Sequence, residues 1–410
     1  MRYRVLSIPS CLLALAILIG WPRPNISTAA SFSEISNPAV AGSLAPSLSA
    51  TPQGQVILSW LEPSGPDLAL RFAIRSERGW SAVQTVIRRP DFDVYAEAPP
   101  AVLKLRNGAF LAVWAQKRHG TGKWPGNYLY TAASWDGGKA WSFPLRIHSD
   151  ASDSEHSFSS IAATGADRAT AIWLDARDYQ AGHHYRLMSA LLTSTGEVKD
   201  ERTIDKDVCT CCPTAFVSTV SGGVAAYRGH NLQEIRDIKV SRLADGIWQS
   251  SHTVHDDEWQ INGCPVNGPA LSANGRHLAA LWFTAVGDTP QVKLAFSEDA
   301  GATFRLPVIL DSPRNAARPV GHVAITLLED GSALAAWLRQ ASSEAEIVVQ
   351  PVTNGESQAL PQVLASGATK DLGYPRMQLL RESVMISWGG SGDLKSVKTA
   401  ILGKHRAIAR

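Results

Sequence analysis

A repeat of about 55 residues constrains the fold of this chain more than any other feature. In each unit a Pro-containing approach, a short apolar strand and a Gly or Asp turn lead into a second strand that ends in an aromatic residue. The seven second strands are 56–60, 110–114, 169–173, 223–227, 278–282, 334–337 and 384–388. Their aromatic residues are separated by 54, 59, 54, 55, 55 and 51 residues. Such a period is typical of a β-propeller with four-stranded blades. We therefore predict an all-β fold with seven blades, with six as the alternative.

The two ends of the chain complement each other in this pattern. Third and fourth strands follow the aromatic strand, as at 292–296 and 304–310, but the last unit ends after its third strand near 396–402. The stretch 32–40 precedes the first unit and resembles a fourth strand without a blade. We predict that it completes the last blade, because ring closure removes an exposed sheet edge. Residues 31–410 then form a single propeller domain.

Residues 1–30 have the order of a secretory signal. Arg2 and Arg4 precede an apolar run at 11–21, and small residues follow at 27–30. The run is too short to span a bilayer as a mature helix, so we expect cleavage near Ala30 and a periplasmic or extracellular protein. An uncleaved membrane anchor is the alternative.

Removal of this leader, with its three arginines, leaves 36 basic and 37 acidic residues. That balance gives no support to a nucleic acid or an anionic membrane surface as a partner. We expect a monomer with no membrane span after cleavage.

Two turns between third and fourth strands share a pattern of Ser, Asp, Gly and an aromatic residue. The Asp is expected to cap backbone amides, the Gly to supply a positive φ, and the aromatic ring to pack between sheets. These turns resemble the Asp-box, or BNR, repeats of the sialidase superfamily. The second turn matches the pattern Ser-x-Asp-x-Gly-x-Thr-aromatic, whereas the first has Ala140 in place of Thr. The residues that carry the resemblance are Asp136, Gly138 and Trp141, and Asp299, Gly301 and Phe304.

The resemblance extends over essentially the whole mature chain and implies a propeller of this superfamily. It does not imply one chemistry, because Asp-boxes stabilise turns and the superfamily includes glycan-cleaving and non-enzymatic proteins. We expect a structural role for both turns.

One face of the predicted disc collects the reactive side chains. Each strand crosses the disc once, so loops between second and third strands lie on the same side as the connections between blades, opposite the Asp-box turns. This side holds Cys209, Cys211, Cys212, Cys264, His119, Asp175, Arg177, Asp178, His183, His184, Arg228, His230, Glu234, Arg318, Tyr374 and Arg376. We predict a ligand site here, centred between the third and fifth blades. The simpler alternative is a set of solvated polar loops.

Four of the five cysteines lie at two places on this face: Cys209, Cys211 and Cys212 precede the fourth blade, and Cys264 precedes the fifth. Three disulfide pairings are possible. In an oxidising compartment Cys264 could bond to the triple cluster, with a second disulfide within that cluster. A second hypothesis is a thiolate site for a soft metal such as copper(I), with His230 or His119 adding a nitrogen ligand. A third is unpaired, inert thiols.

Resemblance to sialidases implies a set of catalytic roles: three arginines that bind the substrate carboxylate, an Asp acid/base, and a Tyr nucleophile activated by a Glu. The catalytic candidates on the expected face are Asp175, Arg177, Arg228, Tyr374 and Glu234. The ligand-binding candidates are Arg177, Asp178, Arg228, His230, Arg318 and Arg376. The Phe/Tyr-Arg-Ile-Pro stretch that opens typical sialidases is absent, so no motif assigns these residues to family positions.

These observations predict an exported propeller that binds a glycan or a soft metal, copper being possible, on the face with the four cysteines. An exo-α-sialidase type of glycoside hydrolase is one alternative. A non-catalytic scaffold held by structural disulfides is the other.

Overall fold

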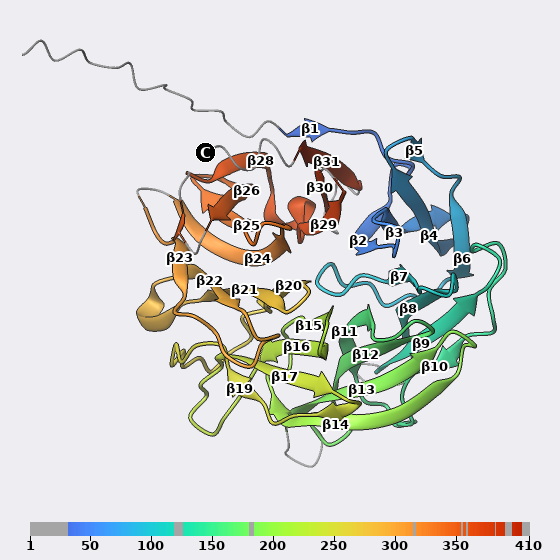
Figure 1. Cartoon of the computed structure of the whole chain (residues 1–410), viewed down its shortest axis with the longest axis horizontal. Coiled ribbons are helices and arrows are strands. Elements are labelled where there is room, and N and C mark those ends of the chain that lie inside the picture. Colours follow the sequence, from blue (N-terminus) through green and yellow to red (C-terminus); the bar gives the residue numbers. More distant parts are fainter. Residues whose placement is uncertain are drawn as a thin grey trace, which may run out of the picture.

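The computed structural model describes residues 32–118, 126–179, 184–314, 317–353, 356–357, 360–381, 383–389 and 396–403. The predicted signal segment 1–30, His119 and His183 lie outside these residues. Seven antiparallel sheets stand in a ring around a central axis, so the protein is a seven-bladed β-propeller (Figure 1). The prediction of seven blades is confirmed. Within the described part of the chain, no helix combines the length and hydropathy needed to cross a membrane.

The first three blades follow the chain in order. Blade 1 contains β2 (Leu44–Ala50), β3 (Val56–Ser64), β4 (Asp67–Ser76), β5 (Gly79–Trp80) and β6 (Gln84–Arg89). Blade 2 contains β7 (Ala101–Lys104), β8 (Phe110–Lys117), β9 (Asn127–Ser134) and β10 (Leu145–Arg146). Blade 3 contains β11 (His156–Ala163), β12 (Arg168–Asp175), β13 (Tyr185–Thr193) and β14 (Val198–Val208).

The next three blades repeat this arrangement. Blade 4 contains β15 (Ala215–Thr219), β16 (Gly222–Arg228), β17 (Ile238–Ala244), β18 (Ile247–Trp248) and β19 (His252–Thr253). Blade 5 contains β20 (Ala270–Asn274), β21 (His277–Thr284), η2 (Val286–Asp288), β22 (Gln291–Ser297) and β23 (Val308–Asp311). Blade 6 contains β24 (Ala317–Leu327), β25 (Ala333–Ala341), β26 (Glu344–Thr353), β27 (Glu356–Ser357) and β28 (Gln362–Gly367), and α1 (Thr369–Leu372) follows it.

Blade 7 is closed by the amino end of the chain, as predicted. It contains β29 (Arg376–Leu380), β30 (Ser383–Trp388) and β31 (Lys398–Gly403), and its outer strand is β1 (Ser33–Glu34) (Figure 1). Ser33 lies opposite Ile401 in this pairing. Asn37 then donates from Nδ2 to the carbonyl of Val397 at 2.9 Å. The closing strand is shorter than the stretch 32–40 from which it was predicted.

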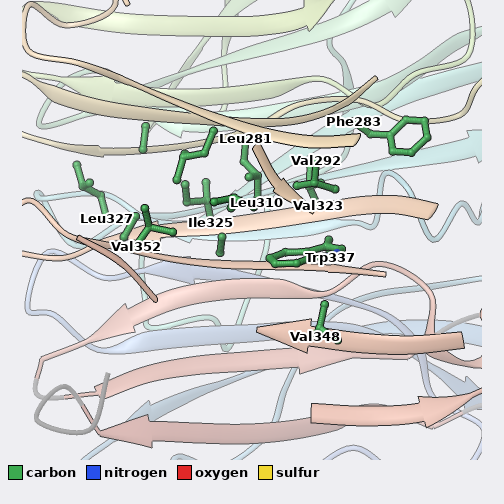
Figure 2. Packing of buried hydrophobic residues seen from close by; sticks show 14 of the residues in the cluster. Leu281, Phe283, Val292, Leu310, Val323, Ile325, Leu327, Trp337, Val348 and Val352 are labelled. Atoms are coloured by element: carbon green, nitrogen blue, oxygen red, sulfur yellow. The ribbon is translucent and has the colours of Figure 1, made fainter. Parts of the chain in front are cut away.

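Apolar side chains of neighbouring sheets form the core between blades. Between blades 5 and 6, Leu281 and Val292 pack against Ile325, Trp337 and Val348 (Figure 2). This follows from the alternation of each strand, which places apolar residues on both faces of a sheet that is covered on both sides.

The repeated aromatic residue has a polar partner in six blades. Its indole N–H or hydroxyl donates to a carboxylate or amide oxygen at 2.7–3.0 Å: Trp60 to Glu62, Trp114 to Gln116, Trp173 to Asp175, Tyr227 to Asp205, Trp282 to Asp257 and Trp337 to Asp311. Asp257 lies in a stretch that connects one blade to the next. Asp205 and Asp311 each lie in the strand just before such a stretch. These hydrogen bonds therefore anchor the connecting stretches to the core, since a buried polar atom of an aromatic residue requires a partner.

The two turns that resemble Asp-boxes are held by their own carboxylates. Asp136 Oδ1 accepts hydrogen bonds from the amides of Lys139 and Ala140, each at 3.0 Å. Asp299 Oδ1 accepts from the Thr303 amide at 2.9 Å, and its second oxygen accepts from the Thr303 hydroxyl at 2.6 Å.

The glycine and the ring of the first turn also meet the neighbouring blade. Gly138 has a φ of 90°, and Trp141 packs edge-on against Phe72 of blade 1 with ring centroids 6.1 Å apart. Capping and packing of this kind stabilise a turn and need no ligand.

Candidate functional site

The connections between blades and the loops after the second strands share one face, here named the crossover face. Isolated bridges join the two kinds of segment, with Val208 opposite Gly229 and Ile235 opposite Gln260. The turns with Asp136 and Asp299 come directly after the third strands β9 and β22 and therefore lie on the opposite face.

The four mature cysteines meet on the crossover face where blade 4 adjoins blade 5. Cys211 and Cys264 form a disulfide between the stretches that lead into β15 and β20. Cys209 and Cys212 are buried thiols whose Sγ atoms lie 3.5 Å apart. Of the two disulfides in the first cysteine hypothesis, the structure contains the one to Cys264 and leaves the other pair reduced.

Cys209 has the environment of a thiolate. The hydrogen bond with Cys212 lowers the pKa of Cys209 to about 5, and the positive charges of Arg228 and Arg236 act in the same direction. Arg236 Nη1 lies 3.4 Å from Cys209 Sγ. Burial raises the pKa of Cys212 well above its usual value, so this thiol keeps its proton. Cys209 and Cys212 also have the C-x2-C spacing common in metal sites, a signal that sequence reasoning missed.

Two of the predicted ligand arginines are already paired within the protein. Arg177 donates to Asp175 Oδ2 at 2.7 Å and to Glu201 Oε1 at 2.5 Å. Arg228 is 2 % exposed, and its acceptors among the described residues are all backbone carbonyls, those of Asn267, Arg236 and Phe283, at 2.6–2.9 Å. Both guanidinium groups stabilise the fold where they lie.

Three further predicted residues have unrelated surroundings. Asp178 forms an ion pair with Arg186, and Arg318 is an exposed residue of β24. Tyr374 is buried, and its hydroxyl donates to the carbonyl of Val266 at 2.5 Å. Burial raises the pKa of Tyr374.

Glu234, the predicted activator of Tyr374, has other partners. Its Oε2 lies 2.7 Å from Arg236 Nη2 and 3.3 Å from His230 Nε2. The structure therefore places the Tyr and the Glu of the sialidase hypothesis in separate hydrogen-bond networks.

A cavity of about 920 Å³ lies along the propeller axis and is lined by the innermost strands of all seven blades. Arg376 lines it where β29 begins, together with Glu97, Thr214 and Tyr374. Tyr374 in turn stacks on His322 with ring centroids 3.8 Å apart. The innermost strands begin at the crossover face, so the end of the cavity that Pro213 and Thr214 line adjoins the cysteines.

Arg376, like Arg228, has no acidic partner among the described residues, but only Arg376 of these two lines the axial cavity. Its Nη2 donates to the carbonyls of Ala96 and Glu97, each at 2.9 Å, and its buried Nε has no hydrogen-bond partner among the described residues. Within the described part of the chain, no carboxylate lies within 4.0 Å of its guanidinium group. Burial lowers the pKa of Arg376 to about 10, which leaves the side chain charged at neutral pH.

No protein-family model and no curated protein matches this sequence. Among solved structures, an α-L-arabinofuranosidase of Fusarium graminearum, a mutant in complex with an iminosugar inhibitor, is 11% identical. Its TM-score is 0.50, and the match covers 90% of this chain and 98% of that one. An α-L-arabinanase of Penicillium chrysogenum complexed with arabinobiose is 12% identical with a TM-score of 0.49, over 91% and 97% of the two chains.

The NanB sialidase of Streptococcus pneumoniae is also similar, at 11% identity and a TM-score of 0.44, over 93% of this chain and 70% of that one. At these identities the likeness concerns the fold.

Proposed function

We propose that this protein is an exported propeller of the sialidase superfamily that binds an acidic carbohydrate at the crossover-face end of its axial cavity. The observation that carries the proposal is the unpaired charge of Arg376, which lines this cavity with a buried Nε that lacks a partner among the described residues. A guanidinium group binds a carboxylate through two parallel hydrogen bonds, and burial strengthens such a pair relative to water.

The lining of the cavity favours a hydroxyl-rich ligand. Its polar groups include Ser160, Thr214 and Glu97, which offer the donors and acceptors that sugar hydroxyls require. The fold is similar to that of an arabinofuranosidase whose structure was solved with an iminosugar inhibitor. By analogy, we propose a sugar ligand for this chain as well.

The test is calorimetric titration of the purified mature protein with three oligosaccharides of similar length: one with glucuronate, one with terminal sialic acid, and a neutral arabino-oligosaccharide. We expect an acidic oligosaccharide to bind more tightly than the neutral one. Loss of a charged hydrogen bond costs about 1.5–3 kcal/mol, so Arg376→Gln should weaken that binding by roughly ten- to a hundredfold. Arg318→Gln, at an exposed arginine, is the control. Equal binding of the neutral sugar, or unchanged binding by Arg376→Gln, would contradict the proposal.

The same protein can be assayed for hydrolysis of a fluorogenic sialoside. Release of the fluorophore by the wild-type protein would favour the hydrolase alternative. A protein that neither binds nor cleaves any of these sugars would favour the scaffold alternative.

A second candidate function is the binding of a soft metal ion, which the thiol pair supports. Cys209 and Cys212 bring two buried sulfur atoms within 3.5 Å of each other, and Cys209 has the lowered pKa of a metal-binding thiolate. Copper(I) favours such ligands. One copper per chain, lost in the Cys209→Ser/Cys212→Ser variant and kept in Cys211→Ser/Cys264→Ser, would support this function; no bound copper in the wild type would exclude it.

A further inference from the structure

A second group of metal-ligating side chains lies on the crossover face, separate from the thiols. It consists of His184 just before β13, Asp207 near the end of β14, and His230 two residues after β16. One ligand atom of each lies within 4.8 Å of the other two. The three residues come from two neighbouring blades, so only the folded ring brings them together.

The His230 ring is held in a fixed orientation between two carboxylates. Its Nδ1 lies 2.7 Å from Asp207 Oδ1, and its Nε2 lies 3.3 Å from Glu234 Oε2. The His230 side chain is 2 % exposed, and its Nε2 is buried without a hydrogen bond of good geometry. The His184 ring lies over His230 with ring centroids 3.7 Å apart.

Glu234 is positioned for this contact by its loop. The backbone of Glu234 has a φ of 58°, a conformation that side chains rarely adopt without support. Asn231 supplies that support, because its Oδ1 accepts hydrogen bonds from the amides of Gln233 and Ile235, each at 3.0 Å. A carboxylate that holds the outer nitrogen of a histidine is the common second-sphere partner of a metal-ligating imidazole.

We infer that His184, Asp207 and His230 form a binding site for a divalent transition-metal ion such as zinc, with Glu234 orienting His230 from behind. Two imidazoles and one carboxylate are ligands that such ions accept. Two atoms bound to one ion at about 2 Å lie roughly 3 Å apart, so His230 Nδ1 and Asp207 Oδ1 need only a small adjustment. The Asp207 side chain is 41% exposed, which leaves coordination positions for water.

A comparable group at the end of blade 3 is less suited to a metal. Asp150, His156 and Asp175 also lie close together, but the Asp175 side chain is fully buried and already accepts hydrogen bonds from Trp173 and Arg177. Its charge is therefore compensated by the protein itself.

The site also differs from the thiol pair in the ligands it offers. The two are adjacent, since Arg236 contacts both Glu234 and Cys209. However, a metal at the histidines has nitrogen and oxygen ligands, whereas a metal at the cysteines has sulfur. A metal ion whose absorption spectrum depends on its ligands can therefore distinguish the two sites.

Cobalt(II) is the probe. It is added to the purified mature protein with its disulfide intact, and unbound metal is removed by dialysis. The cobalt content and the absorption spectrum of the protein are then measured. We expect one cobalt per chain and a spectrum without the charge-transfer band of a cobalt–thiolate bond. His184→Ala and Asp207→Asn should each weaken binding at least about tenfold, and Glu234→Gln by about ten- to a hundredfold. His277→Ala, at an exposed histidine of β21, and Cys209→Ser/Cys212→Ser should bind cobalt as the wild type does.

His184 and Asp207 are the variants of choice because both are partly exposed, and thermal unfolding will show whether each variant folds. Absence of stoichiometric cobalt in the wild type would overturn the inference. So would binding that survives both His184→Ala and Asp207→Asn, or binding that disappears in Cys209→Ser/Cys212→Ser. Sugar binding through Arg376 is measured separately, so failure of one proposal leaves the other intact.

Discussion

Cys209 and Cys212 lie with their Sγ atoms 3.5 Å apart and have opposite pKa shifts. The hydrogen bond between the two sulfur atoms lowers the pKa of Cys209, and the nearby arginines add to this effect. Burial keeps the proton on Cys212. The pair therefore holds one negative charge at neutral pH, beside the disulfide of Cys211 and Cys264.

A pH titration of thiolate absorption in the ultraviolet tests this division of charge. The pKa of Cys209 is lowered to about 5, so one thiolate per chain should persist from neutral pH down to about pH 5 and disappear below it. Cys212→Ala removes the main cause of the shift and should move the midpoint to higher pH more than Arg236→Gln does. A wild-type midpoint near the ordinary cysteine value of about 8.5 would contradict the assignment.

The disulfide between Cys211 and Cys264 should stabilise the contact of blades 4 and 5. It links residues 53 positions apart, and a cross-link of this kind typically contributes about 2–4 kcal/mol. The double variant Cys211→Ser/Cys264→Ser should lower the free energy of unfolding by that amount in a urea titration. The double variant is preferred because a lone Cys211 could bond to Cys209. An unchanged urea midpoint would show that the blades do not need the link.

Trp337 should contribute to stability through its hydrogen bond as well as its packing. The fully buried indole donates to Asp311 at 2.7 Å, and loss of a bond to a charged group costs about 1.5–3 kcal/mol. Trp337→Phe should therefore destabilise the protein more than Trp388→Phe, whose indole N–H has no hydrogen-bond partner among the described residues. Chemical denaturation of both variants provides the comparison. Equal losses would mean that packing alone matters at this position.

The amino end should act as part of blade 7. Deletion of residues 31–37 removes β1 and the Asn37 hydrogen bonds to Val397 and Thr399, and it exposes the edge of β31. We expect a lower melting temperature and self-association in size-exclusion chromatography, because an unpaired edge strand invites pairing with another chain. Asn37→Ala keeps the strand and should cost only about 1 kcal/mol. A truncated protein that melts as the wild type does would refute this role.

The fold could be predicted from the sequence because its determinants are local and repeated. The aromatic residues from Trp60 to Trp388 recur at nearly constant intervals, and a repeat of this kind specifies the blade before any contact is known. The missing strand of the last unit predicted closure by the amino end for the same reason.

The candidate site was harder to predict because it depends on which side chains form hydrogen bonds or ion pairs with one another. Arg177 pairs with Asp175, two residues away, and Tyr374 pairs with a backbone carbonyl instead of Glu234. Composition cannot show that Arg376 lines the axial cavity with an Nε that lacks a hydrogen-bond partner among the described residues, or that Arg228 is enclosed by backbone carbonyls. Nor could it choose among three pairings of four cysteines.

Hydrogen–deuterium exchange with and without a saturating acidic oligosaccharide tests most directly whether ligand binds at the crossover face. We predict slower exchange on binding at 209–214, 264–267 and 374–376, around the crossover-face end of the axial cavity. Slower exchange confined to 135–142 and 298–305, at the turns of the opposite face, would contradict the proposed site.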